Sequence, residues 1–190
     1  DRIVELAGEG DDTVIASTSY TLAPGTEVEN LAAATGTAGI NLTGNELGQT
    51  ITGNAGDNVL TGGGGSDIIS GGAGADTAVF TEAYSAVTGL GWDGTMATVT
   101  IGSTTDTITG VGKLQFSDRA VWLVDDGGGA EYNALAQLFA GSAANGEAAA
   151  GDVIMLGAGN YGAATIDRAV SIVGPAFTTA GSAQTHGTGA

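Results

Sequence analysis

Two aspartates stand at the same place in consecutive nine-residue units, and they are the side chains in this sequence best placed for chemistry. The units span residues 62–70 and 71–79, and Asp67 and Asp76 occupy the sixth position of each. Both follow a run of glycines, which permits tight turns that residues with a Cβ resist. Carboxylates placed at repeat positions favour the binding of cations over a role in solubility alone.

Two earlier units continue the same period, but they carry amides in place of the acids. Residues 44–52 have Gln49 at the sixth position, and residues 53–61 have Asn58. The first of these units also has Leu47 where the pattern expects glycine. In each unit a six-residue turn precedes a three-residue strand whose central apolar residue points inward. The predicted inward residues are Ile51, Leu60, Ile69 and Ala78. Because no single coil buries enough apolar surface, several must stack.

The last two units fit the pattern G-G-x-G-x-D-x-U-x, where U is apolar, and the block 44–79 resembles the RTX family of secreted calcium-binding repeat proteins. This resemblance implies an all-β fold, a right-handed parallel β-roll in which two units make one coil. It also implies Ca²⁺ between turns on the same side of the roll, held by sixth-position carboxylates and backbone carbonyls, the hard oxygen ligands that calcium prefers.

Carried onto this sequence, the resemblance places Asp76 opposite the turn of Asp57 and Asn58, and Asp67 opposite the turn of Gln49. We expect the Asp76 side to be the better formed, because Gln49 replaces the acid on the other side. Asp12, in a degenerate turn, is a weaker candidate. The predicted metal ligands are Asp76, Asp67, Asn58, Asp57, Gly53, Ala55, Gly62, Gly64, Gly71, Ala73 and Asp12.

The remaining sequence divides into segments around this roll. The segment 131–174 resembles the opening of a pectate-lyase-like β-helix, with a short amphipathic helix at 131–140. The expected organisation is degenerate solenoid coils at 1–43, the calcium-binding roll at 44–80, a β-strand cap at 81–126, a linker and short capping helix at 127–150, and the start of a β-helix with a flexible tail at 151–190.

Composition excludes several classes of partner. The chain has 21 Asp and Glu against 4 Lys and Arg, a formal net charge of −17, so nucleic acid and anionic membrane surfaces are improbable partners. There is no cysteine, and no apolar run is long enough for a transmembrane segment. His186 is the only histidine, which excludes ordinary zinc sites and makes a Ser-His-Asp triad improbable. No catalytic residues are expected.

These features favour a calcium-ordered structural module of a large secreted bacterial protein. The resemblance implies an extracellular or cell-surface location reached by type I secretion. Two alternatives stay open at this point. One is a self-assembling surface component, such as an S-layer, adhesin or filament subunit, with copies of itself or cell-surface polysaccharide as partners. The other is a non-catalytic fragment of a polysaccharide epimerase or lyase.

Overall fold

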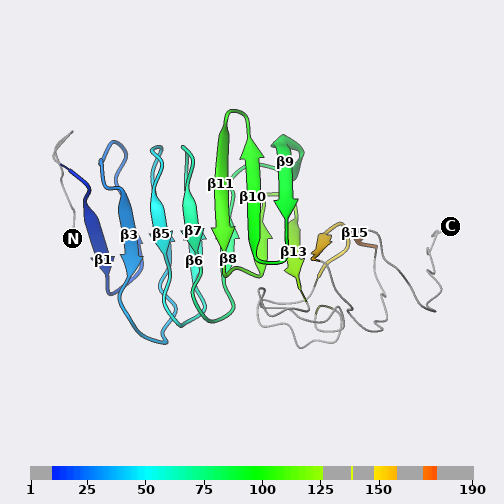
Figure 1. The fold of residues 1–190 in the computed structure, drawn as a ribbon, viewed down its shortest axis with the longest axis horizontal. Coiled ribbons are helices and arrows are strands. Elements are labelled where there is room, and N and C mark those ends of the chain that lie inside the picture. Colours follow the sequence, from blue (N-terminus) through cyan, green and yellow to red (C-terminus); the bar gives the residue numbers. More distant parts are fainter. Residues whose placement is uncertain (1–9, 126–137, 139–147, 158–168, 175–190) are drawn as a thin grey trace.

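The chain winds through two facing layers of short β-strands (Figure 1). The computed structural model describes residues 10–125, 138, 148–157 and 169–174. Successive strands of residues 13–79 alternate between the two layers, so each pair of strands completes one coil. Strands of one layer then pair in parallel with strands of the next coil, which is the arrangement that a repeating turn–strand unit predicts.

The first sheet has seven strands in the order β1-β3-β5-β7-β11-β10-β9. Its members are β1 (Thr13–Ala16), β3 (Asn30–Ala33), β5 (Thr50–Thr52), β7 (Ile68–Ser70), β11 (Thr104–Thr109), β10 (Met96–Ile101) and β9 (Val87–Trp92). The pairs from β1 to β11 are parallel, whereas β11, β10 and β9 form an antiparallel meander.

The second sheet has eight strands in the order β15-β14-β13-β12-β8-β6-β4-β2. Its members are β2 (Tyr20–Thr21), β4 (Leu42–Thr43), β6 (Val59–Thr61), β8 (Thr77–Val79), β12 (Lys113–Gln115), β13 (Ala120–Val124), β14 (Val153–Leu156) and β15 (Ser171–Val173). All pairs are parallel except β12 with β13. A 3₁₀ turn, η1 (Tyr84–Ala86), precedes β9.

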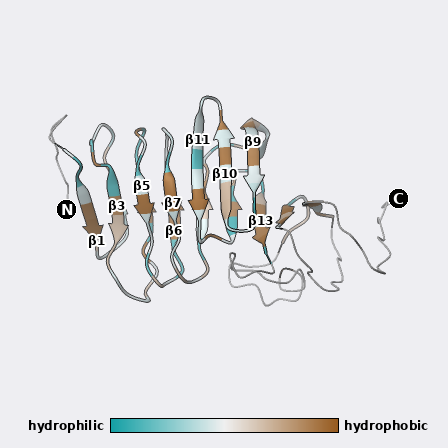
Figure 2. Ribbon diagram, in the orientation of Figure 1, coloured by the Kyte–Doolittle hydropathy of each residue, from teal (hydrophilic) through white to brown (hydrophobic). Residues whose placement is uncertain are grey.

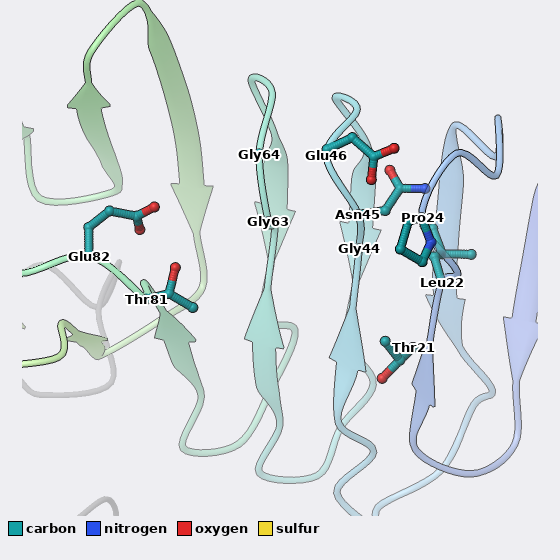
Figure 3. Close-up of a pocket in the computed structure, with 10 residues that line it drawn as sticks. All are labelled: Thr21, Leu22, Pro24, Gly44, Asn45, Glu46, Gly63, Gly64, Thr81 and Glu82. Atoms are coloured by element: carbon teal, nitrogen blue, oxygen red, sulfur yellow. The ribbon is translucent and has the colours of Figure 1, made fainter.

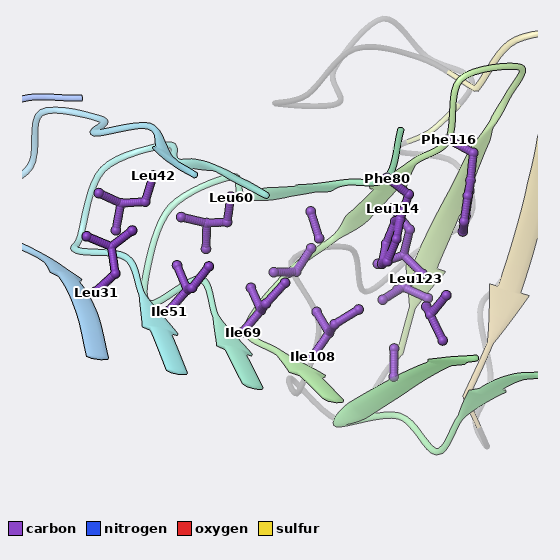
Figure 4. Packing of buried hydrophobic residues seen from close by; sticks show 14 of the residues in the cluster. Leu31, Leu42, Ile51, Leu60, Ile69, Phe80, Ile108, Leu114, Phe116 and Leu123 are labelled. Atoms are coloured by element: carbon purple, nitrogen blue, oxygen red, sulfur yellow. The ribbon is translucent and has the colours of Figure 1, made fainter. Parts of the chain in front are cut away.

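The register of the sheets sets one inward ladder in each layer. Ile51 pairs with Ile69 and Leu60 pairs with Ala78, a step of two nine-residue units in both sheets. Because side chains alternate across a strand, the central residue of each three-residue strand from β5 to β8 faces the opposite sheet. Figure 4 shows the two ladders meeting between the layers. The fully buried members are Leu31, Ile51, Ile69 and Ile108 in the first sheet, and Leu42, Leu60, Ala78 and Leu114 in the second.

Aromatic side chains fill the core where the nonapeptide units end. Phe80 and Phe116 stack with ring centroids 4.8 Å apart, and Tyr84 meets Phe116 edge-on. Beyond them, β13 is buried on both faces. Its outward side chains, Trp122 among them, pack with Ile154 in a second apolar cluster. Figure 2 shows the hydrophobic colour gathered on the strands and the hydrophilic colour mainly in the turns.

The structure confirms the coarse expectation of an almost entirely β chain built from parallel strands. The two short runs expected near residues 151–156 and 169–174 are β14 and β15, which pair in parallel. The predicted helix at 131–140 lies outside the described residues, apart from buried Leu138, and so do residues 1–9 and the tail from 175. In the part of the chain that the structure describes, no helix has the length and apolarity needed to cross a membrane.

Candidate metal centre

The turns of the coil stack along two edges of the molecule. Edge one carries the turns that lead from the first sheet to the second, at 53–58 and 71–76. Edge two carries the turns that lead back, at 44–49 and 62–67. The sixth position of each unit is therefore the last turn residue before a strand, which brings Asp76 to edge one and Asp67 to edge two.

On edge two, Asp67 lies between the coil before it and the coil after it. The backbone N–H of Gln49 donates to Asp67 Oδ1 at 2.7 Å, and the N–H of Asp67 itself donates to Asp106 Oδ1 at 2.9 Å. The side chain of Asp67 is 1% exposed, and its second oxygen, Oδ2, has no hydrogen-bond donor among the described residues. A buried carboxylate oxygen without a donor is costly to keep charged, so this atom needs a proton or a cation.

Burial raises the pKa of Asp67 to about 7, and the neighbouring charge of Asp106 adds to the effect, whereas the hydrogen bond from Gln49 N–H opposes it. Burial, followed by the negative charge of Glu82, also raises the pKa of Asp106, against a lowering by the hydrogen bond from Asp67 N–H. Two adjacent acids with raised pKa values form an electrostatic environment that a divalent cation relieves.

The glycine that opens each unit makes room for the sixth-position side chain. A Cβ at Gly62 would overlap Asp67 Oδ2, and a Cβ at Gly53 would overlap the carbonyl of Gly71 and Oδ1 of Asn58. Only a residue without a side chain lets the turn close around its own carboxylate or amide. The unpaired oxygen of Asp67 therefore sits in a cradle that a larger residue would fill.

On edge one, Asp76 meets the turn of Asp57 and Asn58. The N–H of Asn58 donates to Asp76 Oδ1 at 2.7 Å, and the N–H of Ala75 donates to Asp57 Oδ1 at 2.8 Å. Asp76 is fully buried, and burial raises its pKa to about 6, with the charge of Asp57 adding to the rise and the Asn58 hydrogen bond opposing it. Here the acid is the last of its column, because Gly112 takes the corresponding place in the next coil.

In the two amide units, the sixth-position side chains are satisfied by hydrogen bonds within the protein. Gln49 Nε2 donates to Asn45 Oδ1 at 2.8 Å, and Gln49 Oε1 accepts from the N–H of Asn45 at 3.1 Å. Asn58 Nδ2 donates to the carbonyl of Ile40 at 2.9 Å, and Asn58 Oδ1 accepts from the N–H of Asn54 at 2.9 Å. Both amides are buried, and both are satisfied as donor and acceptor without a metal.

Each predicted ligand lies on the edge that carries the turn of its own unit. Edge one holds Gly53, Ala55, Asp57, Asn58, Gly71, Ala73 and Asp76, and edge two holds Gly62, Gly64, Asp67 and Asp12. Asp12 precedes β1 at the position that Asp67 holds before β7, and its Oδ2 is buried without a donor among the described residues. The predicted set thus divides between two separate places, and the two repeat acids do not meet.

Asp106 is the acid that sequence reasoning missed, because it lies outside the nonapeptide block. Its segment Asp106-Thr-Ile-Thr-Gly110 repeats the second half of the earlier units, as in Asp67-Ile-Ile-Ser-Gly71. Without the preceding glycine-rich turn, the segment looks like an ordinary alternating strand. The acid followed by an apolar central residue and a closing glycine is the signal that could have found it.

Within the described part of the chain, no three Asp, Glu or His side chains converge into a metal site by themselves. A cation on either edge would need backbone oxygens beside the carboxylates. The stacked turns supply these, since carbonyls such as those of Gly62 and Gly71 point toward the turn of the preceding coil. A mixture of carboxylate and carbonyl oxygens suits calcium.

Comparison with known proteins gives one result, which falls on this block. Residues 43–78 match the family model of the RTX calcium-binding nonapeptide repeat, in four copies. The matched segment is less than half of the chain and coincides with the four units whose turns form the two edges. No curated protein gives a significant match, and neither does any solved structure. RTX repeats are calcium-binding modules typical of secreted proteins, and they are generally structural and not catalytic.

Proposed function

We propose that the chain is a calcium-ordered structural module in which Ca²⁺ bound along the two turn edges fixes the coils of residues 44–79. Asp67 would hold the ion on edge two, and Asp76 with Asp57 would hold it on edge one. The remaining ligands would be carbonyls of the glycine-rich turns and the amide oxygen of Asn58. The cation supplies positive charge where the fold buries carboxylates.

The observation that supports this most strongly is the state of Asp67. Its side chain is almost completely buried, one oxygen receives a backbone hydrogen bond, and the other has no donor among the described residues. A structure built for hydrogen bonds alone would place an amide here, as it does at Gln49 and Asn58. An acid in this place is explained by a ligand that prefers a negative charge.

Calcium would act by binding the folded state and not the unfolded chain. At free calcium a hundredfold above the dissociation constant, each independent site would add about 2.7 kcal/mol to the free energy of unfolding. Without calcium, burial of the acids opposes folding, and the many glycines raise the entropy that folding must overcome. Extracellular calcium would therefore favour the ordered coil.

We further propose that the module belongs to a secreted bacterial protein, exported by a type I system and ordered outside the cell. The family match and the repeat's typical occurrence in secreted proteins support this. Export in a calcium-poor compartment would keep the chain unfolded for passage, and higher external calcium would then trigger folding. The role is structural, with no catalytic residue assigned.

Circular dichroism during a calcium titration tests the proposal, with EGTA added at the end to reverse it. The β-strand signal should rise with calcium and fall after chelation, and an Asp76→Ala variant should need more calcium to reach the same signal. A strand signal that chelator leaves unchanged would contradict calcium-coupled ordering.

The parallel pairing of β13, β14 and β15 supports a second proposal, that β14 and β15 begin another solenoid. Val153 pairs with Ser171 and Ile154 with Ile172, again a step of 18 residues. Such a continuation would fit a parent protein that modifies polysaccharide, whose active site would lie in further coils. Assay of the full-length parent on uronate polysaccharides would test this, and an inactive parent would leave self-assembly at the cell surface as the remaining alternative.

A further inference from the structure

We propose that residues 80–82 and Asp106 are the two halves of one further turn of the edge-two stack, split by an inserted β-meander, and that this split turn closes a cation site over Asp67. The inference rests on the proposed calcium function and adds residues outside the matched block. It assigns Asp106 as a direct ligand and Glu82 as a charge at the mouth of the site.

The hydrogen bonds of Asp106 reproduce those of a sixth-position residue. The N–H of Gln49 donates to Asp67 Oδ1, and in the next coil the N–H of Asp67 donates to Asp106 Oδ1. The strands that follow repeat the relation, since Ile68 N–H donates to Gln49 O and Thr107 N–H donates to Asp67 O, both at 2.8 Å. Asp106 is thus the next member of the column that contains Gln49 and Asp67.

The first half of the same turn is found directly after β8. Strand β8 stacks on β6, and Val59 pairs with Thr77, so residues 80–82 follow β8 as residues 62–64 follow β6. Figure 3 shows Thr81 and Glu82 continuing the row of turns formed by Gly63, Gly64 and Glu46. The groove over these turns has a volume of about 440 Å³, and its lining runs through four successive coils.

The insertion between the two halves is the antiparallel part of the first sheet. Strands β9 and β10 leave the stack after residue 82, and β11 returns to pair in parallel with β7 through Thr107 and Ile68. The chain therefore leaves the turn, forms the meander, and re-enters the stack at the sixth position. A continuous unit would need only a few residues to cover that distance.

A small cavity lies where the halves meet the turn of Asp67. Its volume is about 10 Å³, about the minimum that holds one water molecule. Gly62, Glu82 and Asp106 are among the lining residues, and the donor-free Oδ2 of Asp67 lies against Gly62. Asp106 is 9% exposed and accepts its hydrogen bond at Oδ1, which leaves Oδ2 for a ligand.

Charge and size together select a small cation for this cavity. Asp67 and Asp106 are both nearly buried, the backbone N–H of Asp67 donates to the Asp106 carboxylate, and the exposed Glu82 adds a third negative charge at the opening. On the opposite side of Asp67, the amide of Gln49 is already engaged with Asn45. The cation on edge two would therefore lie toward the split turn, and its binding would anchor the meander to the coil.

The test combines calorimetric calcium titration with amide chemical shifts of the ¹⁵N-labelled 190-residue chain. Addition of Ca²⁺ should shift the Thr81, Glu82 and Asp106 amides together with that of Gly63. Asp106→Asn keeps the acceptor for Asp67 N–H but removes the charge, so it should weaken one calcium site about tenfold or more. Glu82→Gln, at the exposed mouth, should weaken the same site less and carries no risk to the core.

Two control variants keep the outcomes separable. Glu46→Gln removes one charge from the same edge and should leave that site unchanged, and Asp76→Asn should weaken a different site on edge one. The split-turn site is wrong, and the repeat function stands, if Asp67→Asn weakens calcium binding while Asp106→Asn does not. The same conclusion follows if calcium leaves the amide chemical shifts of Thr81 and Glu82 unchanged. If the unmodified chain binds no calcium at millimolar concentration, both proposals fail.

Discussion

The two amide units at 44–61 and the two acid units at 62–79 share one backbone path, but they satisfy their buried side chains by different means. In the amide units, Gln49 and Asn58 both donate and accept hydrogen bonds, and all of these bonds are to other groups of the protein. In the acid units, Asp67 and Asp76 accept a backbone hydrogen bond and carry pKa values raised by burial. The exchange of amide for acid, nearly isosteric for Asn58 against Asp76, thus changes what the turn requires.

The comparison teaches that calcium dependence belongs to single units and not to the coil as a whole. An amide supplies donors where neighbouring carbonyls accept, so the turn is complete as folded. An acid supplies only acceptors, and it needs a cation or a proton to offset its burial. The amide units would then depend on calcium less than the acid units, although Asp57 and Asn58 also contribute to the proposed edge-one site, and the acid units would order against them, since each coil contacts only its neighbours.

Withdrawal of calcium should produce the largest effect. If one site on each edge is filled at a hundredfold excess of calcium, chelation should lower the free energy of unfolding by about 2.7 kcal/mol for each site. Urea unfolding followed by circular dichroism, with and without EGTA, measures the difference. If the unfolding curves with and without EGTA superimpose, calcium does not stabilise the acid units, and the two kinds of unit do not differ in their need for it.

Conversion of an amide unit to an acid unit should give the next largest effect. In Asn58→Asp the new carboxylate would face the carbonyl of Ile40 and the Asn54 Oδ1, which Asn58 Nδ2 now contacts as a donor. The loss of stability without calcium should be about 1–3 kcal/mol, and calcium should restore part of it. Asn41→Asp adds the same charge at an exposed position and should change the unfolding free energy little. Equal effects of both variants would mean that the amide contacts contribute nothing.

The reverse exchange should have a smaller effect of opposite sign. Asp67→Asn removes a buried charge and leaves an oxygen for Gln49 N–H, so the calcium-free protein should gain on the order of 1 kcal/mol. The same variant should lose much of its stabilisation by calcium. Glu46→Gln, at an exposed position of the same edge, serves as the control. A variant that is less stable than the parent in EGTA would argue against an uncompensated acid at this position.

The smallest effect is expected from a change of pH from 7 to 6 in the absence of calcium. The pKa of Asp67 is raised from 3.8 to about 7 and that of Asp76 to about 6, so the folded state binds more protons than the unfolded chain between roughly pH 4 and 7. The stability from these groups is therefore present at low pH and lost as pH rises through the folded values. One pH unit changes stability by about 1.4 kcal/mol for each proton of difference, and both groups are only partly titrated here.

Thermal unfolding in EGTA at the two pH values measures this change, and the melting temperature should be higher at pH 6. Calcium affinity should be lower at pH 6 than at pH 7, because the ion must displace the bound protons. A melting temperature that falls on acidification would show that burial does not raise the pKa values of these two acids in the folded state.

Much of the coil could be predicted from the nine-residue period alone. The inward positions Ile51, Leu60, Ile69 and Ala78 are all buried and stack in two ladders. The sequence also indicates that Asp76 and Asp57 share an edge, since units two apart in sequence are neighbours in space. These results depend on regular spacing, which a single sequence displays directly.

The rest could not be predicted because it depends on contacts between distant segments. Asp106 joins the column of Asp67 through a hydrogen bond across 39 residues, and the inserted meander hides that relation from any periodic pattern. The pairing of Gln49 with Asn45 was also missed, because the departures from the acid pattern suggested a weaker turn. In the structure the same departures form a complete hydrogen-bonded turn.

Hydrogen exchange of backbone amides, followed with and without calcium, tests the central claim most directly. We predict that protection of residues 62–79 increases strongly when calcium is added, whereas residues 44–61 are protected in both conditions and change much less. Equal protection of the two regions without calcium, or an equal response of both to calcium, would contradict the account.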